Sequence, residues 1–126
     1  MLKGGESGFL DIPKDFKWVR PWQPLNDKAR PFYGKAFDVR EGEISDLIVE
    51  ELKSELHSDH PLYGSNFFAI GYCTTDVDDV LLLTSRQDMP IVCVHLTWKK
   101  ERSQHWPHFD VYRDFGEWAA QMKREG

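Results

Sequence analysis

The sequence has 126 residues, of which 40% are apolar and 29% are charged, and its formal net charge is −5. With eight Phe, five Trp and four Tyr, a chain of this length can close one hydrophobic core. The aromatic content excludes a disordered chain. The acidic balance argues against a nucleic-acid-binding protein, because neutralising phosphates requires clustered Lys and Arg.

No apolar run approaches the length of about 20 residues that spans a bilayer. The first ten residues lack the basic start, apolar middle and small-residue cleavage site of a secretory signal. We therefore expect a cytoplasmic protein that binds neither membranes nor nucleic acid. In a reducing compartment, Cys73 and Cys93 are expected to be small buried thiols rather than a disulfide or a metal site.

Residues 1–40 form an arm that is rich in proline and aromatic side chains. Four of the seven prolines lie within the first 31 residues and disfavour a long helix there. The aromatic residues are too numerous for a disordered tail, so we expect the arm to pack on the core, with short extended pieces near residues 16–19 and 35–39.

The first predicted helix covers residues 43–57. Apolar residues recur there at spacings of three, one, four and four, and they are Ile44, Leu47, Ile48, Leu52 and Leu56. This spacing is typical of an amphipathic helix. Pro61 disfavours helical geometry at His60, so the segment 58–64 ends the helix.

Three predicted strands follow, over residues 66–74, 79–84 and 91–98. Each is short, rich in β-branched or aromatic residues, and bounded by turn-forming residues. Alternation along the third strand predicts two faces. The face that meets the core has Val92, Val94, Leu96 and Trp98, and the opposite face has Ile91, Cys93, His95 and Thr97.

A loop is predicted over residues 99–112, and a second helix begins near Phe115. Asp114 and Glu117 have the spacing of an N-cap and its reciprocal partner, and the helix carries an apolar stripe of Phe115, Trp118, Ala119 and Met122. The order of elements predicts an α+β fold: two layers, with an antiparallel meander of three to four strands and the helices packed on one face.

We divide the chain into the arm, residues 1–40, and an α-β-β-β-α domain, residues 41–126. The core is expected to include Leu47, Ile48, Leu52, Ile70, Leu82, Val92, Val94, Leu96 and Trp118.

Negative charge is concentrated in the middle of the chain. Residues 41–88 carry two Lys or Arg against eleven Asp or Glu, a net charge of −9, whereas the segments before and after carry +3 and +1. This distribution fits either a solvated surface or a docking surface for a basic protein partner, where a focused field speeds association. The candidate docking residues are Glu43, Asp46, Glu50, Asp76, Asp78 and Asp79.

Metal motifs are weak in this sequence. Two pairs of histidines at a spacing of three could together form a zinc site, but they lie far apart and adjoin prolines; they are His57/His60 and His105/His108. The aspartates at 76, 78 and 79 could bind a hard cation, yet the residues that follow lack the Gly and Glu of an EF-hand loop. We favour an acidic turn and expect no metal and no cofactor.

His95 is the best single catalytic candidate, because burial or a neighbouring carboxylate could tune its pKa. A structural histidine with a satisfied ring is the alternative. Cys93 shares the predicted face of His95 and would need such a base to act as a nucleophile. The sequence contains no Gly-rich phosphate loop, nucleophile elbow or zinc-protease motif, so an enzyme is not indicated.

An aromatic loop near the end of the chain is a second candidate interaction site, since aromatic residues dominate interface energetics. Its candidate contact residues are Trp106, Phe109 and Tyr112. Packing of Trp106 and Phe109 between the sheet and the last helix fits the same pattern.

Five strings occur in a distinctive order between residues 43 and 122: His60-Pro61-Leu62-Tyr63-Gly64, Asp78-Asp79-Val80-Leu81, Val94-His95-Leu96-Thr97-Trp98, Trp106-Pro107 and Tyr112…Phe115…Trp118. Together they resemble a family of small bacterial proteins without an established activity. The resemblance implies a bacterial origin and a stand-alone α+β domain. It carries over no site residue, and residues 1–40 lie outside it.

We expect a non-catalytic protein-binding domain, as in an immunity or antitoxin-like protein that neutralises a basic toxin domain, acting as a monomer or weak homodimer. The alternative is a small hydrolase or nuclease-like enzyme that uses His95 with Asp78 or Asp79.

Overall fold

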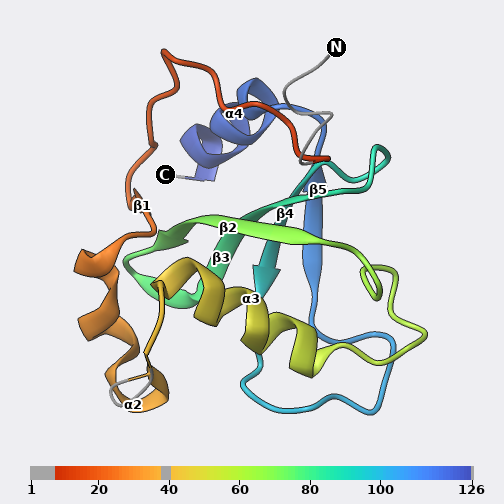
Figure 1. Cartoon of the computed structure of the whole chain (residues 1–126). Coiled ribbons are helices and arrows are strands. Elements are labelled where there is room, and N and C mark those ends of the chain that lie inside the picture. Colours follow the sequence, from red (N-terminus) through yellow and green to blue (C-terminus); the bar gives the residue numbers. More distant parts are fainter. Residues whose placement is uncertain (1–7, 38–40, 126) are drawn as a thin grey trace.

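The computed structural model describes residues 8–37 and 41–125. It contains one antiparallel sheet of five strands that lie in chain order, β1-β2-β3-β4-β5 (Figure 1). The strands are β1 (Trp22–Pro24), β2 (Phe67–Cys73), β3 (Asp76–Thr84), β4 (Ile91–His95) and β5 (Phe109–Tyr112). This arrangement confirms the predicted α+β class and the antiparallel meander.

The sheet has two strands that the sequence pattern did not predict, and both lie at its edges. β1 belongs to the arm, and β5 lies in the segment that we expected to be a loop. Each has three or four residues, too few to establish an alternating pattern. β1 also contains Pro24, which an edge strand accommodates because its N–H side is not needed for pairing.

The helices are η1, a 3-10 helix (Asp27–Tyr33), and the α-helices α2 (Gly34–Phe37), α3 (Ile44–Glu55) and α4 (Phe115–Glu125). The predicted first helix is therefore confirmed with slightly tighter bounds. Residues 35–37 belong to α2, so the expected extended piece at 35–39 is wrong there, and its remaining residues lie outside the described ranges. Within those ranges, every helix is too short or too polar to cross a membrane.

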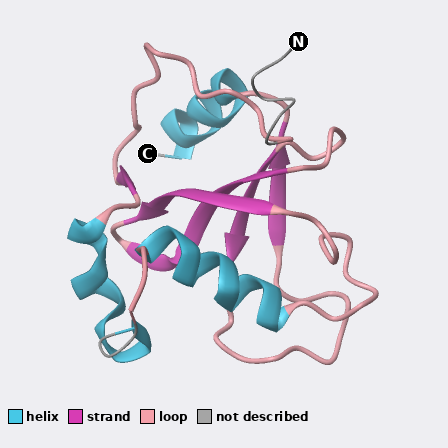
Figure 2. Cartoon of the chain, in the orientation of Figure 1, coloured by secondary structure: helices cyan, strands magenta, loops and turns pink. Residues whose placement is uncertain are grey.

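The helices lie on both faces of the sheet, which corrects the prediction of one covered face (Figure 2). On one face, α3 packs against Val80 and Leu82, whereas on the other, α4 packs against Leu81 and Leu83. The reason lies in β3 itself: consecutive apolar residues point to opposite faces of a strand, so each face needs a cover. The molecule consequently has three layers rather than two.

Every residue of the predicted core is buried. On the α3 face the helix contributes its apolar stripe, with Ile48 and Leu52 fully inaccessible, and the predicted face of β4 meets it through Val92 and Val94. Full burial of an aliphatic side chain contributes about 1.5–3 kcal/mol. The cluster on the α3 face is the larger of the two apolar clusters that pack against the sheet.

Trp118 of α4 is the centre of the other cluster and is completely buried. The arm supplies most of its surroundings: the rings of Phe16, Trp18 and Trp22 have centroids 5.7, 5.6 and 5.7 Å from that of Trp118. Space for Trp18 exists because Gly71 of β2 has no side chain, and a Cβ there would collide with the indole ring.

The start of α4 has the predicted capping arrangement. The carboxylate of Asp114 accepts the backbone N–H of Glu117 at 2.8 Å, and the Glu117 carboxylate accepts the backbone N–H of Arg113, also at 2.8 Å. These bonds satisfy N–H groups that a helix N-terminus leaves free. They define where α4 begins, and the packing of Phe115, Trp118 and Met122 holds the helix over the sheet as a wall of the site described next.

Candidate functional site

The six predicted acidic residues do not form one surface. Glu43, Asp46 and Glu50 are exposed on the solvent side of α3. Asp79 points to the opposite face of the sheet, because it alternates with Val80, which packs under α3. The structure thus separates the helix carboxylates from the Asp79 carboxylate by the thickness of the sheet.

Asp78 has a structural partner on the α3 face. Its Oδ1 accepts a hydrogen bond from the indole Nε1 of Trp98 at 2.7 Å. Trp98 follows the end of β4 with a positive φ of 61°, an uncommon conformation for a residue with a side chain. The Asp78 carboxylate therefore stabilises the chain where it leaves the sheet.

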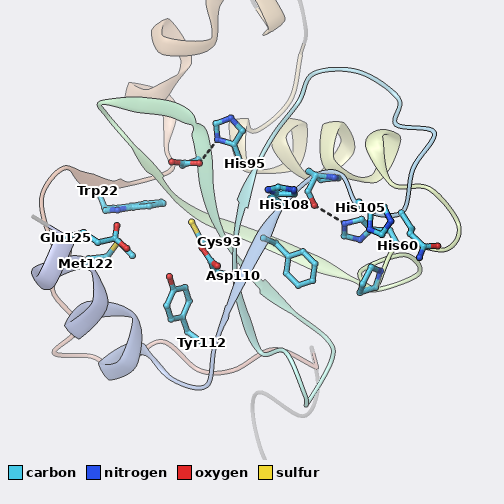
Figure 3. Close-up of a pocket in the computed structure, with 15 residues that line it drawn as sticks. Trp22, His60, Cys93, His95, His105, His108, Asp110, Tyr112, Met122 and Glu125 are labelled. Carbon is cyan, nitrogen blue, oxygen red and sulfur yellow. Dashed lines mark hydrogen bonds and ion pairs between the residues drawn. The ribbon is translucent and has the colours of Figure 1, made fainter.

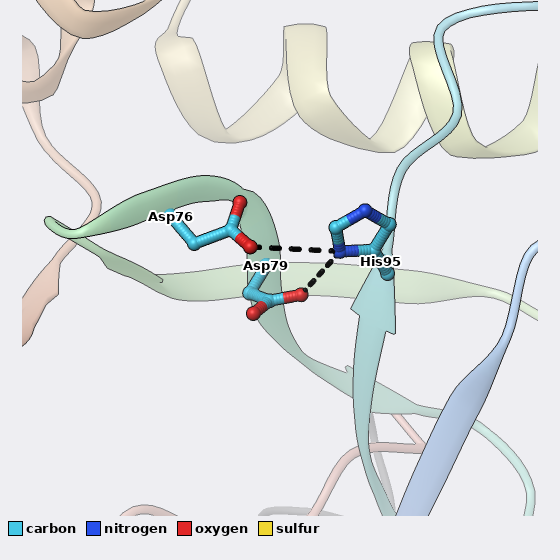
Figure 4. A group of neighbouring side chains, drawn as sticks. All are labelled: Asp76, Asp79 and His95. Atoms are coloured by element: carbon cyan, nitrogen blue, oxygen red, sulfur yellow. Dashed lines mark hydrogen bonds and ion pairs between the residues drawn. The ribbon is translucent and has the colours of Figure 1, made fainter.

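Asp79 is paired with His95, the catalytic candidate of the sequence. The two residues are direct neighbours in the β3–β4 register. His95 Nδ1 lies 2.7 Å from Asp79 Oδ1 and 4.0 Å from Asp76 Oδ2 (Figure 4). Of the two aspartates that the sequence offered as partners for His95, strand alternation selects Asp79 and directs Asp78 away.

The contact between His95 and Asp79 changes the pKa of both groups. The hydrogen bond that His95 Nδ1 donates to the Asp79 carboxylate raises the pKa of His95, although partial burial acts in the opposite direction. Burial raises the pKa of the Asp79 carboxyl, and the hydrogen bond to His95 opposes this increase. The side chains of His95 and Asp79 are 47% and 32% exposed, so the two groups form a partly solvated ion pair. Because its pKa is raised, His95 stays protonated to a higher pH than a free imidazole does.

Asp76, Asp79 and His95 are also the group of metal-ligating side chains that the described residues bring together, with ligand atoms all within 4.8 Å of one another. Carboxylate and imidazole ligands suit several divalent metals, so these three residues could hold one. The ion pair accounts for the same spacing without a metal, because Nδ1 of His95 lies within hydrogen-bonding distance of Asp79 Oδ1. The expectation of no metal stays a prediction.

His60 is a structural histidine rather than part of a four-histidine site. Its ring is buried; Nδ1 accepts the N–H of Leu62 at 3.0 Å, and Nε2 lies 2.9 Å from the carbonyl of Pro107. This assignment places the proton on Nε2, and burial lowers the pKa of the ring. Both ring nitrogens are used in holding two loops together.

The three predicted aromatic contact residues point in different directions. Trp106 is 44% exposed and stacks on His108, with ring centroids 4.0 Å apart. Phe109 packs beside the α3 cluster, whereas Tyr112 is buried in the α4 cluster. Trp106 and Phe109 therefore do not fill the space under the last helix, and the aromatic segment is no single surface.

A cavity of about 600 Å³ lies on the α4 face of the sheet. It extends from α4 to the loop that carries His105 and His108, with Cys93 between them (Figure 3). Three carboxylates line it, those of Asp79, Asp110 and Glu125, and no Lys or Arg occurs among its lining residues. We call this cavity the carboxylate pocket.

Cys93 lines the carboxylate pocket but is a poor nucleophile. Burial raises the pKa of its thiol, and the charges of Asp79 and Asp110 raise it further. The reactive form of cysteine is the thiolate, so this environment suppresses reactivity. Cys93 and His95 do share a face, as predicted, but Nδ1 of His95 is turned to Asp79 instead.

Sequence reasoning missed two of the three pocket carboxylates. Asp110 lies on the unpredicted strand β5, and Glu125 is the last residue of α4. No local pattern connects them to Asp79, because the three meet only when the sheet and α4 are assembled. The lining residues of β4 and β5 include no Lys or Arg, and this was a weak signal of an acidic pocket.

Comparison with protein-family models, with curated proteins and with solved structures found no match to this chain. Four of the five strings that occur in a distinctive order in the sequence meet in the fold. His60 contacts Pro107, and the β3 string contacts the β4 string through Asp78–Trp98 and Asp79–His95. These contacts explain four strings as parts of one corner of the structure, whereas Tyr112, Phe115 and Trp118 of the fifth lie in the α4 cluster; none of them assigns an activity.

We predict that His95 titrates above its ordinary pKa of about 6.5. Replacing Asp79 by Asn removes the main cause of the increase, so the pKa of His95 in Asp79→Asn should fall, because partial burial still lowers it and only the weaker effects of Asp76 and Asp78 remain to raise it. Histidine ring resonances followed by NMR across the pH range measure both values. An unchanged pKa in Asp79→Asn would show that the pair does not form in solution.

Proposed function

We propose that this chain is a non-catalytic protein-binding domain that docks a basic partner at the opening of the carboxylate pocket. The observation that carries the proposal is the pocket lining, which has three carboxylates and neither Lys nor Arg. Asp79 is paired with His95, so the excess negative charge of the pocket comes from Asp110 and Glu125. A concave surface with such an excess and apolar walls concentrates its field and attracts the opposite charge. It also rejects partners of the same sign.

The acidic side of α3 supports the proposal less strongly. Its carboxylates stand on a convex helix whose opposite side is buried, and such charged faces are common on any water-exposed helix. Two of the other predicted docking residues are engaged within the protein, Asp78 with Trp98 and Asp79 with His95. The exposed carboxylates of Glu43, Asp46 and Glu50 on α3 are the alternative docking face.

The partner that we infer is a basic toxin domain, which this chain would neutralise as an immunity or antitoxin-like protein. The support is the charge of the pocket and the absence of a recognisable catalytic motif in the sequence. It is not a likeness to any immunity protein.

Charge reversal separates the two docking faces. Asp110→Lys with Glu125→Lys changes the pocket, and Glu43→Lys with Asp46→Lys changes α3 by the same net charge. Against a basic partner purified from the native host, the pocket pair should slow association about tenfold at low salt and flatten its salt dependence. Association rates measured by surface plasmon resonance at two salt concentrations provide the test.

The α3 pair is the matched control and should change the association rate less than about twofold. Circular dichroism should confirm that both variants are folded. If only the α3 pair slows association, the docking face is α3 and the proposal is wrong. Failure to recover any basic protein that binds reversibly also overturns it.

A second candidate function is a hydrolase or nuclease-like enzyme, and the 2.7 Å contact of His95 with Asp79 in a cavity favours it. A carboxylate that orients an imidazole is the arrangement of a general base. Turnover of ester or phosphodiester reporters that is lost in His95→Ala would support this candidate over the binding protein.

A further inference from the structure

We propose that the α4 end of the carboxylate pocket binds one guanidinium or ammonium group, presented by a basic side chain of the partner. The inference rests on the proposed function and specifies the chemistry that the site recognises. The binding position is the space bordered by Trp22, Tyr112, Met122, Asp110 and Glu125, with Cys93 as its floor (Figure 3).

Three elements build this end of the pocket, and β1 is distant in sequence from β5 and α4. Trp22 comes from β1, Tyr112 and Asp110 from β5, and Glu125 from the last turn of α4. Asp110 and Tyr112 share a face of β5 because they are two residues apart in a strand. Asp110 is exposed, and Glu125 accepts one hydrogen bond from Gln121, which leaves oxygen lone pairs for a bound cation.

The carboxylates act on the same point inside the pocket. Beyond the effect of burial, the charges of Asp79, Asp110 and Glu125 all raise the pKa of the Cys93 thiol. Burial likewise raises the pKa of Tyr112 to about 12, with further contributions from Asp110 and Glu125. Burial is the main cause of both increases, and the carboxylate charges add to it. The geometry carries the inference: Asp110 and Glu125 line the same end of one cavity, where their negative charges would stabilise a positive group.

The walls favour an organic cation over a metal ion. Trp22, Tyr112 and Met122 are nearly fully buried and offer apolar contact. The aliphatic stem of an Arg or Lys side chain can pack on such walls while its charged head meets the carboxylates. Planar guanidinium also forms paired hydrogen bonds with carboxylates. A small hard cation would gain nothing from the apolar part of the lining.

The experiment titrates the full-length protein with N-butylguanidinium and with N-butylurea, its neutral analogue of the same shape. Backbone and indole N–H resonances are followed by two-dimensional NMR. N-Butylguanidinium should give saturable shifts at Cys93, Asp110 and the Trp22 indole, and N-butylurea should not. Shifts that are equal for both compounds, or no saturable shift at these residues, overturn the proposal.

Paired variants test whether the carboxylates bind the cation. Asp110→Asn with Glu125→Gln should weaken N-butylguanidinium binding about fivefold, as expected from the loss of two partly exposed ion pairs. Asp11→Asn with Asp15→Asn removes two exposed carboxylates from the arm, outside the pocket lining, and should leave binding unchanged. Equal weakening in both pairs would mean that net charge alone attracts the probe and would contradict a defined site.

A third comparison distinguishes the source of the cation. Acetylated arginine amide imitates a protein side chain, and spermidine represents free polyamines. The arginine compound should bind at least as tightly as spermidine, whereas tighter binding of spermidine overturns the assignment to a protein side chain. The titrations with small cations need no protein partner. If they fail, the charge-reversal experiment still tests whether the pocket docks a basic protein, and if the charge-reversal experiment fails, the titrations still test whether the pocket binds a cation.

Discussion

The buried carboxylate of Glu55 fixes the point at which β4 leaves the sheet. Its oxygens accept the backbone N–H groups of Thr97 and Trp98 at 2.9 and 2.8 Å, together with the Thr97 hydroxyl at 3.1 Å, and its side chain is inaccessible to solvent. A buried carboxylate without such partners would cost several kcal/mol. The end of α3 and the exit of β4 therefore form only together.

This contact positions the candidate site. It places Trp98 where its indole contacts Asp78. The next residue of β3, Asp79, points to the other face of the sheet and contacts His95. His60 holds the returning loop at Pro107, so that the chain comes back as β5 and brings Asp110 to the pocket. The same strand exit therefore shapes the structural corner on the α3 face and, through β5, one wall of the carboxylate pocket on the α4 face, while α4 supplies Glu125 to that pocket.

The sequence pattern was sufficient for α3, α4 and the three central strands, because each has enough apolar residues to show its period, as Leu47 to Leu52 and Val92 to Leu96 do. The pattern could not show that α4 lies on the second face, because it does not indicate which element covers Leu81 and Leu83. The pairing of the edge strands and the position of Asp110 in the pocket lining both depend on tertiary assembly. Glu55 had a detectable signal: a carboxylate within an apolar helical stripe indicates a buried partner.

Amide hydrogen exchange at Thr97 and Trp98 tests the role of Glu55 most directly. In the wild-type protein both amides should be protected, and in Glu55→Gln their protection should fall by about tenfold or more relative to Val94, because the charged acceptor is lost. Protection at Val94 serves as the reference for the intact sheet. Rapid exchange of both amides in the wild-type protein, or equal protection in the variant, would contradict the account.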